Sequence, residues 1–300
     1  MSNDELTISD VQNDDTKNLC NIYQSNDSVN DEGSDLIVLH DNLYHTETEF
    51  SKLILEQGYS TSHYVTVLSL NIANLLSKLG SLKNFLANIS TNGNKPDIVS
   101  VVETHISESI NAGYDDAALT NIVPGYKFFH KGRSLRKGGG VGVLVSDDLK
   151  SEAGICTMTQ KKVSFIEEQF ENVVVRIPGC IVSISTNIKK DLVIAAIYRQ
   201  PNSDNLETFL SCTERLLNSV DKPNNEIIVT GDMNLDLLKY ERHLPTSRYL
   251  DIMTTHSMLP TIVRPTRIKN KSATLIDHIF TRNNALFPVC GILILILILS

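Results

Sequence analysis

The sequence lacks the cysteine pattern of a zinc site or of a disulfide framework. Its five cysteines are scattered, odd in number, and have neither CxxC nor Cys/His spacing. The N-terminus also lacks a basic stretch followed by an apolar core, so neither a secretory signal nor a transit peptide is indicated. We therefore expect an intracellular protein in a reducing compartment.

No apolar run is long enough to suggest a membrane partner. Residues 291–300 alternate Ile and Leu without a charge, but even when extended back to Ala285 the run is interrupted by Pro288 and falls short of the ~20 residues that span a bilayer. We interpret Ile292–Leu299 as a buried strand, with a membrane anchor as the alternative.

Positive charge is also in short supply, since the 300 residues carry a net charge of −8. Residues 1–60 hold 13 Asp and Glu against 2 Lys and Arg, whereas residues 61–300 hold 22 against 25. The mildly basic body permits a polyanionic partner without identifying one. We divide the chain into an acidic segment, 1–60, whose first 34 residues we expect to be disordered, and one folded domain, 61–300.

Short apolar runs ending in polar residues follow from Tyr64 onward, and they are typical of buried strands. Leucines and other apolar residues recur at helical spacing in 75–89 and in 206–217. Strands that alternate with helices predict an α/β sandwich. The predicted strands are 65–70, 98–102, 141–145, 173–177, 192–197 and 227–229.

Four polar residues stand where predicted strands end: Asn71, Glu103, Asp232 and Asn234. Each alone has a bland explanation, because a terminal Glu is usually solvated and Gly-Asp-x-Asn is a common turn. Together they supply hard oxygen ligands and hydrogen-bond donors from separate strands, as a Mg²⁺ site for phosphodiester hydrolysis requires.

The order of motifs resembles the endonuclease/exonuclease/phosphatase superfamily, typified by DNase I. The resemblance runs from about Tyr64 to Ser300 and implies a DNase I-like four-layer α/β sandwich, two packed sheets flanked by helices, which we expect to be C-terminally incomplete. The motifs are LSLNI (68–72), PDIV (96–99) leading to Glu103-Thr104, GGGV (138–141), IYRQPN (197–202), GDMN (231–234) and TLIDHI (274–279).

The residues of several of these motifs are similar to those in the endonuclease domain of jockey-type non-LTR retrotransposons, which belong to the LINE-like elements. That resemblance implies a nuclease that uses Mg²⁺ or Mn²⁺ to nick target DNA and prime reverse transcription. It further implies element RNA and a reverse transcriptase as partners and access to the nucleus. No stable homo-oligomer is implied.

Carried over by position, Glu103 would bind the metal beside Asn71, and Tyr198 would contact the scissile phosphate. Asp232 would orient or activate the attacking water, and Asn234 would stabilise the transition state. These roles agree with chemistry, because a carboxylate accepts a proton from water while an amide and a phenol donate to developing negative charge.

Asp277 and His278 are adjacent, but the resemblance does not make them a catalytic pair. It implies that Asp277 orients the histidine of a later Ser-Asp-His motif and that His278 is structural. The chain ends at Ser300, where that motif would begin. We therefore expect truncation before the final motif and strongly reduced nuclease activity.

Basic residues offer candidate DNA contacts at Arg133, Arg136, Lys137, Arg199 and Arg267, although such side chains are usually just solvated. Gly138–Gly140 indicates a flexible turn into a strand, with a phosphate-binding loop as the alternative. Two other functions stay open: a catalytically dead DNA-binding relic, and a phosphatase or phosphodiesterase of the same fold acting on another substrate.

Overall fold

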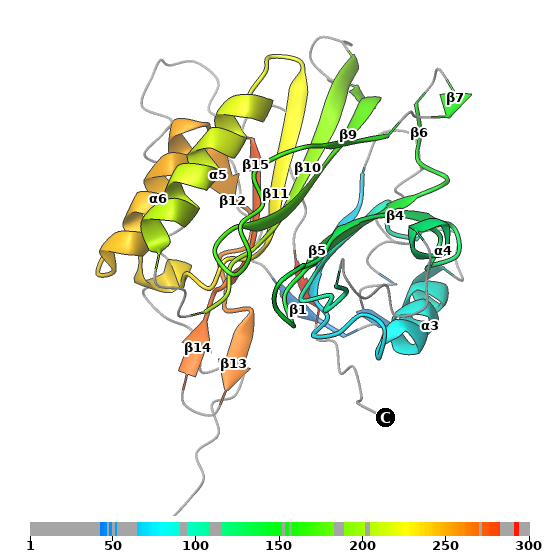
Figure 1. Ribbon diagram of the computed structural model, residues 1–300, viewed down its shortest axis with the longest axis horizontal. Helices are drawn as coiled ribbons and strands as arrows, with labels where there is room; N and C mark the ends of the chain where they lie inside the picture. The colour runs from blue at the N-terminus through cyan, green and yellow to red at the C-terminus, as the bar shows by residue number, and fades with distance from the viewer. Residues whose placement is uncertain are drawn as a thin grey trace, which may run out of the picture.

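A computed structural model gives the arrangement of most of the folded domain (Figure 1). The expected disordered stretch, residues 1–34, lies outside the described residues. The structure describes residues 43–46, 48–49, 52, 65–90, 95–107, 116–151, 154–155, 158–182, 189–201, 205–269, 272–282 and 291–293.

The first sheet has four strands in the order β2-β3-β5-β4, of which β2 and β3 are parallel and the other pairs antiparallel. All five residues of β3 are buried, which explains why its sequence IVSVV is continuously apolar apart from Ser100. The strands are β2 (Val67–Asn71), β3 (Ile98–Val102), β4 (Tyr126–Lys131) and β5 (Val141–Ser146).

The second sheet has six strands in the order β12-β15-β11-β10-β9-β8, and only its β10–β11 pair is parallel. Its register aligns Glu171, Tyr198, Asp232 and Asp277 in one row across four strands. The strands are β8 (Thr159–Lys161), β9 (Glu171–Val182), β10 (Lys189–Tyr198), β11 (Asn225–Asp232), β12 (Met258–Pro260) and β15 (Asp277–Arg282).

Helices cover the outer faces of the two sheets (Figure 1). α3 (Leu79–Ser90) and α4 (Asp116–Thr120) lie on the four-stranded sheet, and α5 (Leu206–Val220) and α6 (Leu244–Thr255) lie on the six-stranded sheet. α5 begins where the Asn205 side chain accepts a hydrogen bond from the Thr208 N–H.

A third apolar cluster joins the two sheets face to face, with Val143 and Val145 of β5 against Val173 and Ile194 of the other sheet. The predicted α/β sandwich of four layers is therefore confirmed. No helix within the described ranges is both long and apolar enough to cross a membrane.

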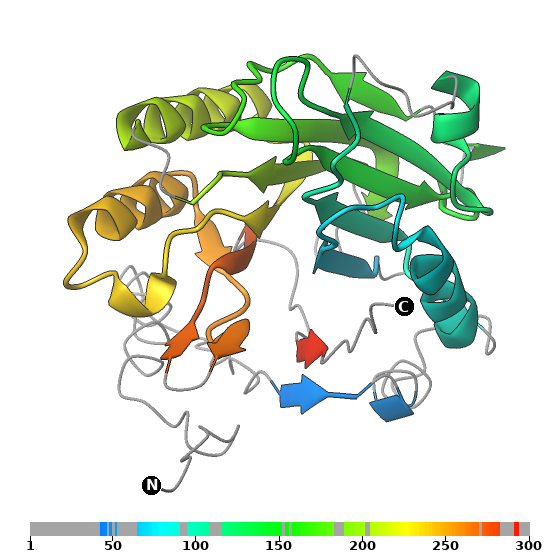
Figure 2. The same ribbon diagram turned by 60° about the horizontal axis from the view of Figure 1, so that its bottom comes forward.

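Short elements lie at the margins of the sandwich. β1 (Leu43–His45), from the acidic segment, pairs in parallel with β16 (Gly291–Leu293), and Figure 2 shows the two strands side by side. The expected strand 292–299 thus has its start in β16, while residues 294–300 lie outside the described residues. The remaining elements are β6 (Lys150–Ser151), β7 (Gly154–Ile155), the hairpin β13 (Arg267–Lys269) with β14 (Ser272–Thr274), and a 3-10 turn, η2 (Leu237–Lys239).

Candidate active site

Strand ends from both sheets meet at one rim of the sandwich. In the first sheet, Asn71 is the last residue of β2 and Glu103 follows β3, and these strands run parallel in register. In the second sheet, Asp232 ends β11, opposite Asp277 at the start of the antiparallel β15. Sheet topology thus brings together polar residues as distant in the sequence as Asn71 and Asp277.

The side-chain amide of Asn71 links the two sheets. Its Nδ2 donates to Glu103 Oε1 at 2.9 Å and to Asp232 Oδ2 at 3.1 Å. Its Oδ1 accepts from the Ala73 N–H at 3.2 Å, which fixes the orientation of the amide. Asn71, Glu103 and Asp232 therefore form a single hydrogen-bonded unit across the sandwich.

The backbone has positive φ angles at five residues in or beside this unit, Ala73, Asn74, Glu103, His105 and Asn234. Glu103, His105 and Asn234 have φ angles of 56°, 55° and 49°, in the left-handed region that side chains seldom adopt. The Glu103 turn is held by hydrogen bonds from Asn74 N to Glu103 O, 2.7 Å, and from His105 N to Gly139 O, 2.8 Å. Such strain persists only where surrounding contacts enforce it, and it tends to gather at functional sites.

The carboxylates at the rim repel one another. Burial, with the nearby Asp277 and Glu103 carboxylates, raises the pKa of Asp232 to about 7, although hydrogen bonds from Asn234 N–H and Asn71 oppose the rise. Burial also raises the pKa of Asp277, against the opposing influence of Thr266 and Arg267. Like charges held this close, and partly removed from water, are arranged for a positive partner or for a proton.

Neutral donors surround the carboxylates. Tyr198, buried at the end of β10, has a raised pKa because of burial and the Glu103 and Asp232 charges, so its phenol keeps its proton. Asn234 N–H donates to Asp232 Oδ1 at 3.0 Å, and Asn234 Nδ2 donates to Arg199 O at 2.7 Å. These contacts fix the conformation of the GDMN turn.

The donor set fits a hard divalent cation. Within the described ranges, no three His, Cys, Asp or Glu side chains gather as an all-protein metal cage. Mg²⁺ does not require one, because it commonly binds through one or two carboxylates and completes its octahedron with water and substrate phosphate. Glu103 and the Asn71 amide provide such a partial set of ligands. The carboxyl group of Asp232, whose pKa is raised, lies beside them.

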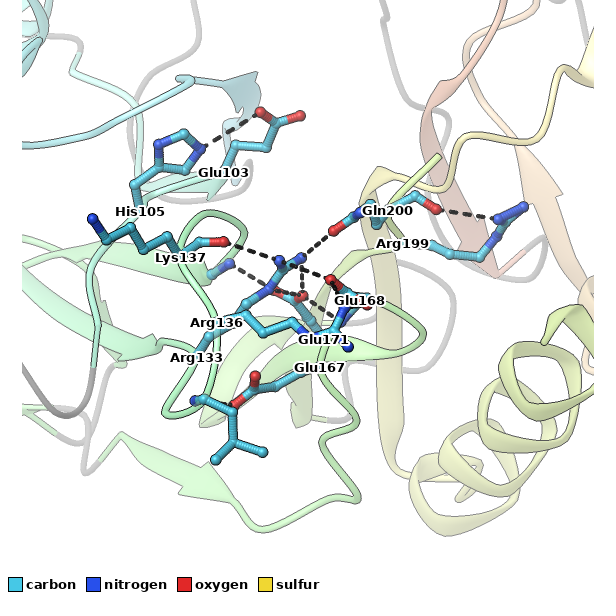
Figure 3. Close-up of polar contacts among 12 residues, drawn as sticks. Glu103, His105, Arg133, Arg136, Lys137, Glu167, Glu168, Glu171, Arg199 and Gln200 are labelled. Atoms are coloured by element: carbon cyan, nitrogen blue, oxygen red, sulfur yellow. Dashed lines mark hydrogen bonds and ion pairs between the residues drawn. The ribbon is translucent and has the colours of Figure 1, made fainter. Parts of the chain in front are cut away.

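Two of the five basic residues expected to touch DNA are buried instead. Arg133 is 3% exposed, and its guanidinium bonds Glu171 Oε1 at 2.6 Å and Gln200 Oε1 at 2.9 Å (Figure 3). Arg199 is also buried, and its guanidinium lies over the Phe209 ring. The expectation of phosphate contact does not fit either residue, because an inward-facing guanidinium with protein partners is not available to a phosphate.

The other three basic residues are exposed near the rim. Arg136 and Lys137 are neighbours on one loop, and Arg136 forms an ion pair with Glu168. Figure 3 shows this loop next to His105. Arg267, in β13, lies close enough to Asp277 to lower the pKa of that carboxyl group. These positions suit contacts with a polyanion that enters the site.

The glycines before β5 form a tight, closely packed turn. Gly138, Gly139 and Gly140 all have positive φ, and a Cβ on Gly139 would lie 2.4 Å from Arg133 Nε and 2.5 Å from Glu171 Oε2. Gly140 N–H donates to Glu171 Oε2 at 2.6 Å. The turn therefore closes over a buried ion pair.

His278 faces the core, as expected of a structural residue. Its Nε2 lies 3.0 Å from Leu235 O and 3.1 Å from Leu275 O, so this nitrogen carries the proton, while Nδ1 has no hydrogen-bond partner among the described residues. Burial lowers the pKa of His278 to about 4.

Sequence reasoning missed His105 and Glu171. His105 Nε2 lies 3.8 Å from Glu103 Oε2, and its place two residues after Glu103 was a usable signal. Glu171, the partner of Arg133, had no signal, because the two residues are 38 positions apart, one in the loop after β4 and the other at the start of β9, and their pairing depends on the fold.

Comparison with solved structures shows the fold. An AP endonuclease from Leishmania major superposes with a TM-score of 0.56 at 11% identity over 91% of each chain. A 3′ phosphatase from Neisseria, solved with a product DNA hairpin, gives 0.51 at 13% identity over 73% of this chain and 87% of its own. The endonuclease domain of TRAS1, a telomere-specific non-LTR retrotransposon, gives 0.48 at 13% identity over 73% and 85%.

No curated protein matches the sequence significantly. Residues 68–298 match the Endonuclease/Exonuclease/phosphatase family, and this range includes every strand end at the rim and both sheets apart from Val67. The chain belongs to the Endonuclease/Exonuclease/phosphatase family, whose members hydrolyse phosphate esters.

Proposed function

We propose that this chain is a Mg²⁺-dependent phosphodiesterase that nicks DNA, of the retroelement endonuclease type. The observation that carries the proposal is the Asn71 amide, which holds Glu103 and Asp232 together across two sheets at 2.9 and 3.1 Å. Carboxylates held close together and partly removed from water are costly, and a site for a cation and a phosphate accounts for that cost.

Each residue has a role that its surroundings support. Glu103 and Asn71 would hold the metal, which when bound would neutralise phosphate charge and make water more acidic. Asp232, with a pKa of about 7, is poised to accept a proton from the attacking water near neutrality. The negative charge of Asp277 would help to keep the pKa of Asp232 high. Asp277 would also orient the histidine of a Ser-Asp-His motif at the phosphate.

Two neutral donors would stabilise the transition state. The phenol of Tyr198 stays protonated and can donate to a phosphate oxygen. The Asn234 side-chain amide donates one N–H to Arg199 O. Its second N–H can donate to the developing negative charge.

DNA is the favoured substrate for two reasons. The motifs are similar to those of jockey-type endonucleases, and the basic groups Arg136, Lys137 and Arg267 are exposed. In that setting the domain would open the target strand for reverse transcription, in the nucleus and beside element RNA. Steep salt dependence of binding is expected, since phosphate contacts release counterions.

The test is nicking of supercoiled plasmid by the purified chain with Mg²⁺, with Mn²⁺, and with EDTA. We expect nicking with either metal, at the strongly reduced rate that the sequence predicts, and we expect EDTA and Glu103→Gln to abolish it. Asp251→Asn is the matched control, because that carboxylate is exposed on α6 on the outer face of the six-stranded sheet. Nicking that survives Glu103→Gln would refute the site assignment.

Two other outcomes identify the alternatives. Cleavage of a phosphoinositide without cleavage of plasmid would indicate a phosphatase or phosphodiesterase of the same fold. Salt-sensitive DNA binding by a folded chain that never cuts would indicate a catalytically dead DNA-binding relic.

A further inference from the structure

A small pocket lies toward the end of the six-stranded sheet that is remote from the candidate active site. It is lined by Lys161 of β8, Arg176 of β9, Asn225 at the start of β11, and Lys222 in the turn that follows α5. Asn225 and Asp232 stand at the two ends of β11, which at roughly 3.3 Å per residue places them about 23 Å apart. The pocket is therefore separate from the rim that carries the carboxylates.

The pocket has the size of one small polar group. Its volume is about 140 Å³. At about 30 Å³ for each water, this is room for roughly four or five water-sized groups, and so for a single tetrahedral phosphate group. Because Lys222 is exposed, such a group can enter from solvent.

Positive charge is in excess around this pocket. The acidic residues that neighbour its lining residues already have basic partners. The pairs are Arg176 with Asp191, Arg282 with Asp221, and Lys190 with Glu226. Among the described residues, neither Lys161 nor Lys222 forms a hydrogen bond or an ion pair through its side chain. Two positive charges are therefore left over, which is the number that a phosphate dianion carries with opposite sign.

The two lysines and the arginine lie close enough to affect one another. Burial lowers the pKa of Lys161, and the charges of Lys222 and Arg176 lower it further. A helix dipole favours a lysine just beyond the end of α5, which would explain Lys222 alone. It does not explain why Lys161, from a different part of the chain, faces the same pocket. A bound anion would relieve the repulsion among all three groups.

Arg176 is held in place for such a role. Its Nε donates to Asp191 Oδ2 at 2.8 Å, its Nη2 donates to the same oxygen, and Asp191 Oδ1 accepts from the Gly179 N–H at 2.9 Å. A guanidinium has five N–H donors, so the remaining ones can meet a second anion. The planar, fixed donors of an arginine suit phosphate oxygens.

We propose that Lys161, Arg176 and Lys222 form a binding pocket for a phosphate group, either free phosphate or a phosphomonoester. The two lysines supply the uncompensated charge, and Arg176 supplies oriented N–H donors. The Asp191 carboxylate is engaged by Arg176 and Gly179, so the pocket offers no group that would activate water, and it binds phosphate without hydrolysing it. The inference goes beyond the proposed function and does not depend on it.

The first test reads the two lysines directly. The full chain is treated with an amine-acylating reagent in EDTA, so that no divalent cation draws phosphate to the rim, and the modification of each lysine is measured by mass spectrometry. Phosphate titrated to roughly 20 mM should slow the modification of Lys161 and Lys222 at least ~5-fold relative to chloride of equal ionic strength. Lys83, on α3 over the other sheet, should react equally in both salts. Equal rates at Lys161 and Lys222 in the two salts would overturn the proposal.

Substitution of the lysines separates the pocket from the general stabilising effect of phosphate on folded proteins. The double variant Lys161→Gln/Lys222→Gln leaves no carboxylate without a partner, so it should fold as the wild type does. Phosphate, compared with chloride, should raise the urea midpoint of the wild type and of the control Lys83→Gln more than that of the double variant. Either single substitution should weaken phosphate binding about 10-fold, the effect of losing one charge-assisted hydrogen bond. Equal midpoint gains in all of these proteins would refute the pocket.

A mononucleotide and the matching nucleoside identify the source of the phosphate group. Protection of Lys161 and Lys222 by the nucleotide as well as by phosphate would show that the pocket accepts a phosphomonoester, and protection by phosphate alone would show a site for the free anion. Protection by the nucleoside would contradict the assignment, because it has no phosphate. None of these measurements involves cleavage, so a chain that fails to nick DNA would refute the proposed function and leave this inference standing.

Discussion

The molecule contains two clusters of charged side chains close to each other, and they are built on opposite principles. In the ion pair under the glycine turn, Arg133 and Glu171 are 3% and 0% exposed, and Glu171 also accepts hydrogen bonds from Gly140 N–H and Glu168 N–H. At the rim, Asp232 and Asp277 face Glu103 as like charges, and the pKa values of both aspartates are raised. The first cluster is balanced within the protein, whereas the carboxylates of the second raise one another's pKa values although Arg267 lies near Asp277.

The difference indicates which cluster serves stability and which serves function. A buried charge whose partners are all protein groups is fixed in place, and breaking it leaves an uncompensated ion. A cluster of like charges is retained against its own repulsion, which favours a role in binding or proton transfer. Substitutions in the two clusters should therefore separate activity from stability.

The largest effect is expected at the rim. Asp232→Asn should reduce plasmid nicking by about 10³-fold, because the proton acceptor is lost. The free energy of unfolding without metal should stay level or rise slightly, since one repelling charge is removed. Nicking rates and urea unfolding of the same preparation measure both, and a variant that unfolds easily would contradict a functional reading of the rim.

The ion pair should give the opposite pattern. Glu171→Gln removes the carboxylate 2.6 Å from the buried Arg133 guanidinium, leaves only the more distant Glu168 at 3.8 Å, and should lower the free energy of unfolding by about 3 kcal/mol. Glu207→Gln is the matched control, because its pair with Arg248 is exposed on helix surfaces and its loss should change little. Unfolding in urea measures both variants; similar midpoints would remove the distinction between the clusters.

Much of this architecture could be predicted from the sequence. Continuous apolar runs located β3, β5, β10 and β11, because a strand buried on both faces requires such a run. Helix α6 was missed, since its buried face includes Thr246 and Tyr249, which weaken the apolar period. Strand β4 was missed where Tyr126 and Phe128 alternate with Lys127 next to a basic loop.

The site was foreseeable only in part, for a physical reason. Asn71, Glu103 and Asp232 could be grouped because strand ends gather at one edge of a sandwich. The burial of Arg133 could not be foreseen, because it depends on a counter-charge from β9, which is distant in the sequence. Sequence pattern locates charges on elements, but only packing shows which of them are compensated.

A smaller effect is expected from His278, through pH. The unfolded chain binds a proton at this histidine below about pH 6.5, whereas the folded chain resists protonation down to about pH 4. The stability that the neutral ring contributes is therefore complete above pH 6.5 and declines as pH falls toward 4, by roughly 3 kcal/mol in all. Urea unfolding between pH 7 and 4.5 should show this slope, and His278→Gln should flatten it.

The smallest effects belong to the exposed loop. Arg136→Gln or Lys137→Gln should weaken DNA binding modestly and lower the slope of log affinity against log salt by about 1 each, with no change in stability. Arg133→Gln should instead destabilise the fold through Glu171. Salt titrations of binding test these variants, and an unchanged slope in both would exclude this loop from DNA contact.

Metal-dependent stabilisation tests the account of the rim most directly. Urea unfolding of the wild-type chain and of Glu103→Gln would be followed as Mg²⁺ is added, because a cation that binds only the folded state stabilises it by mass action. We predict that Mg²⁺ raises the free energy of unfolding of the wild type and not that of Glu103→Gln. No stabilisation of the wild type, or equal stabilisation of both, would contradict the claim that the carboxylates of the rim form a cation site.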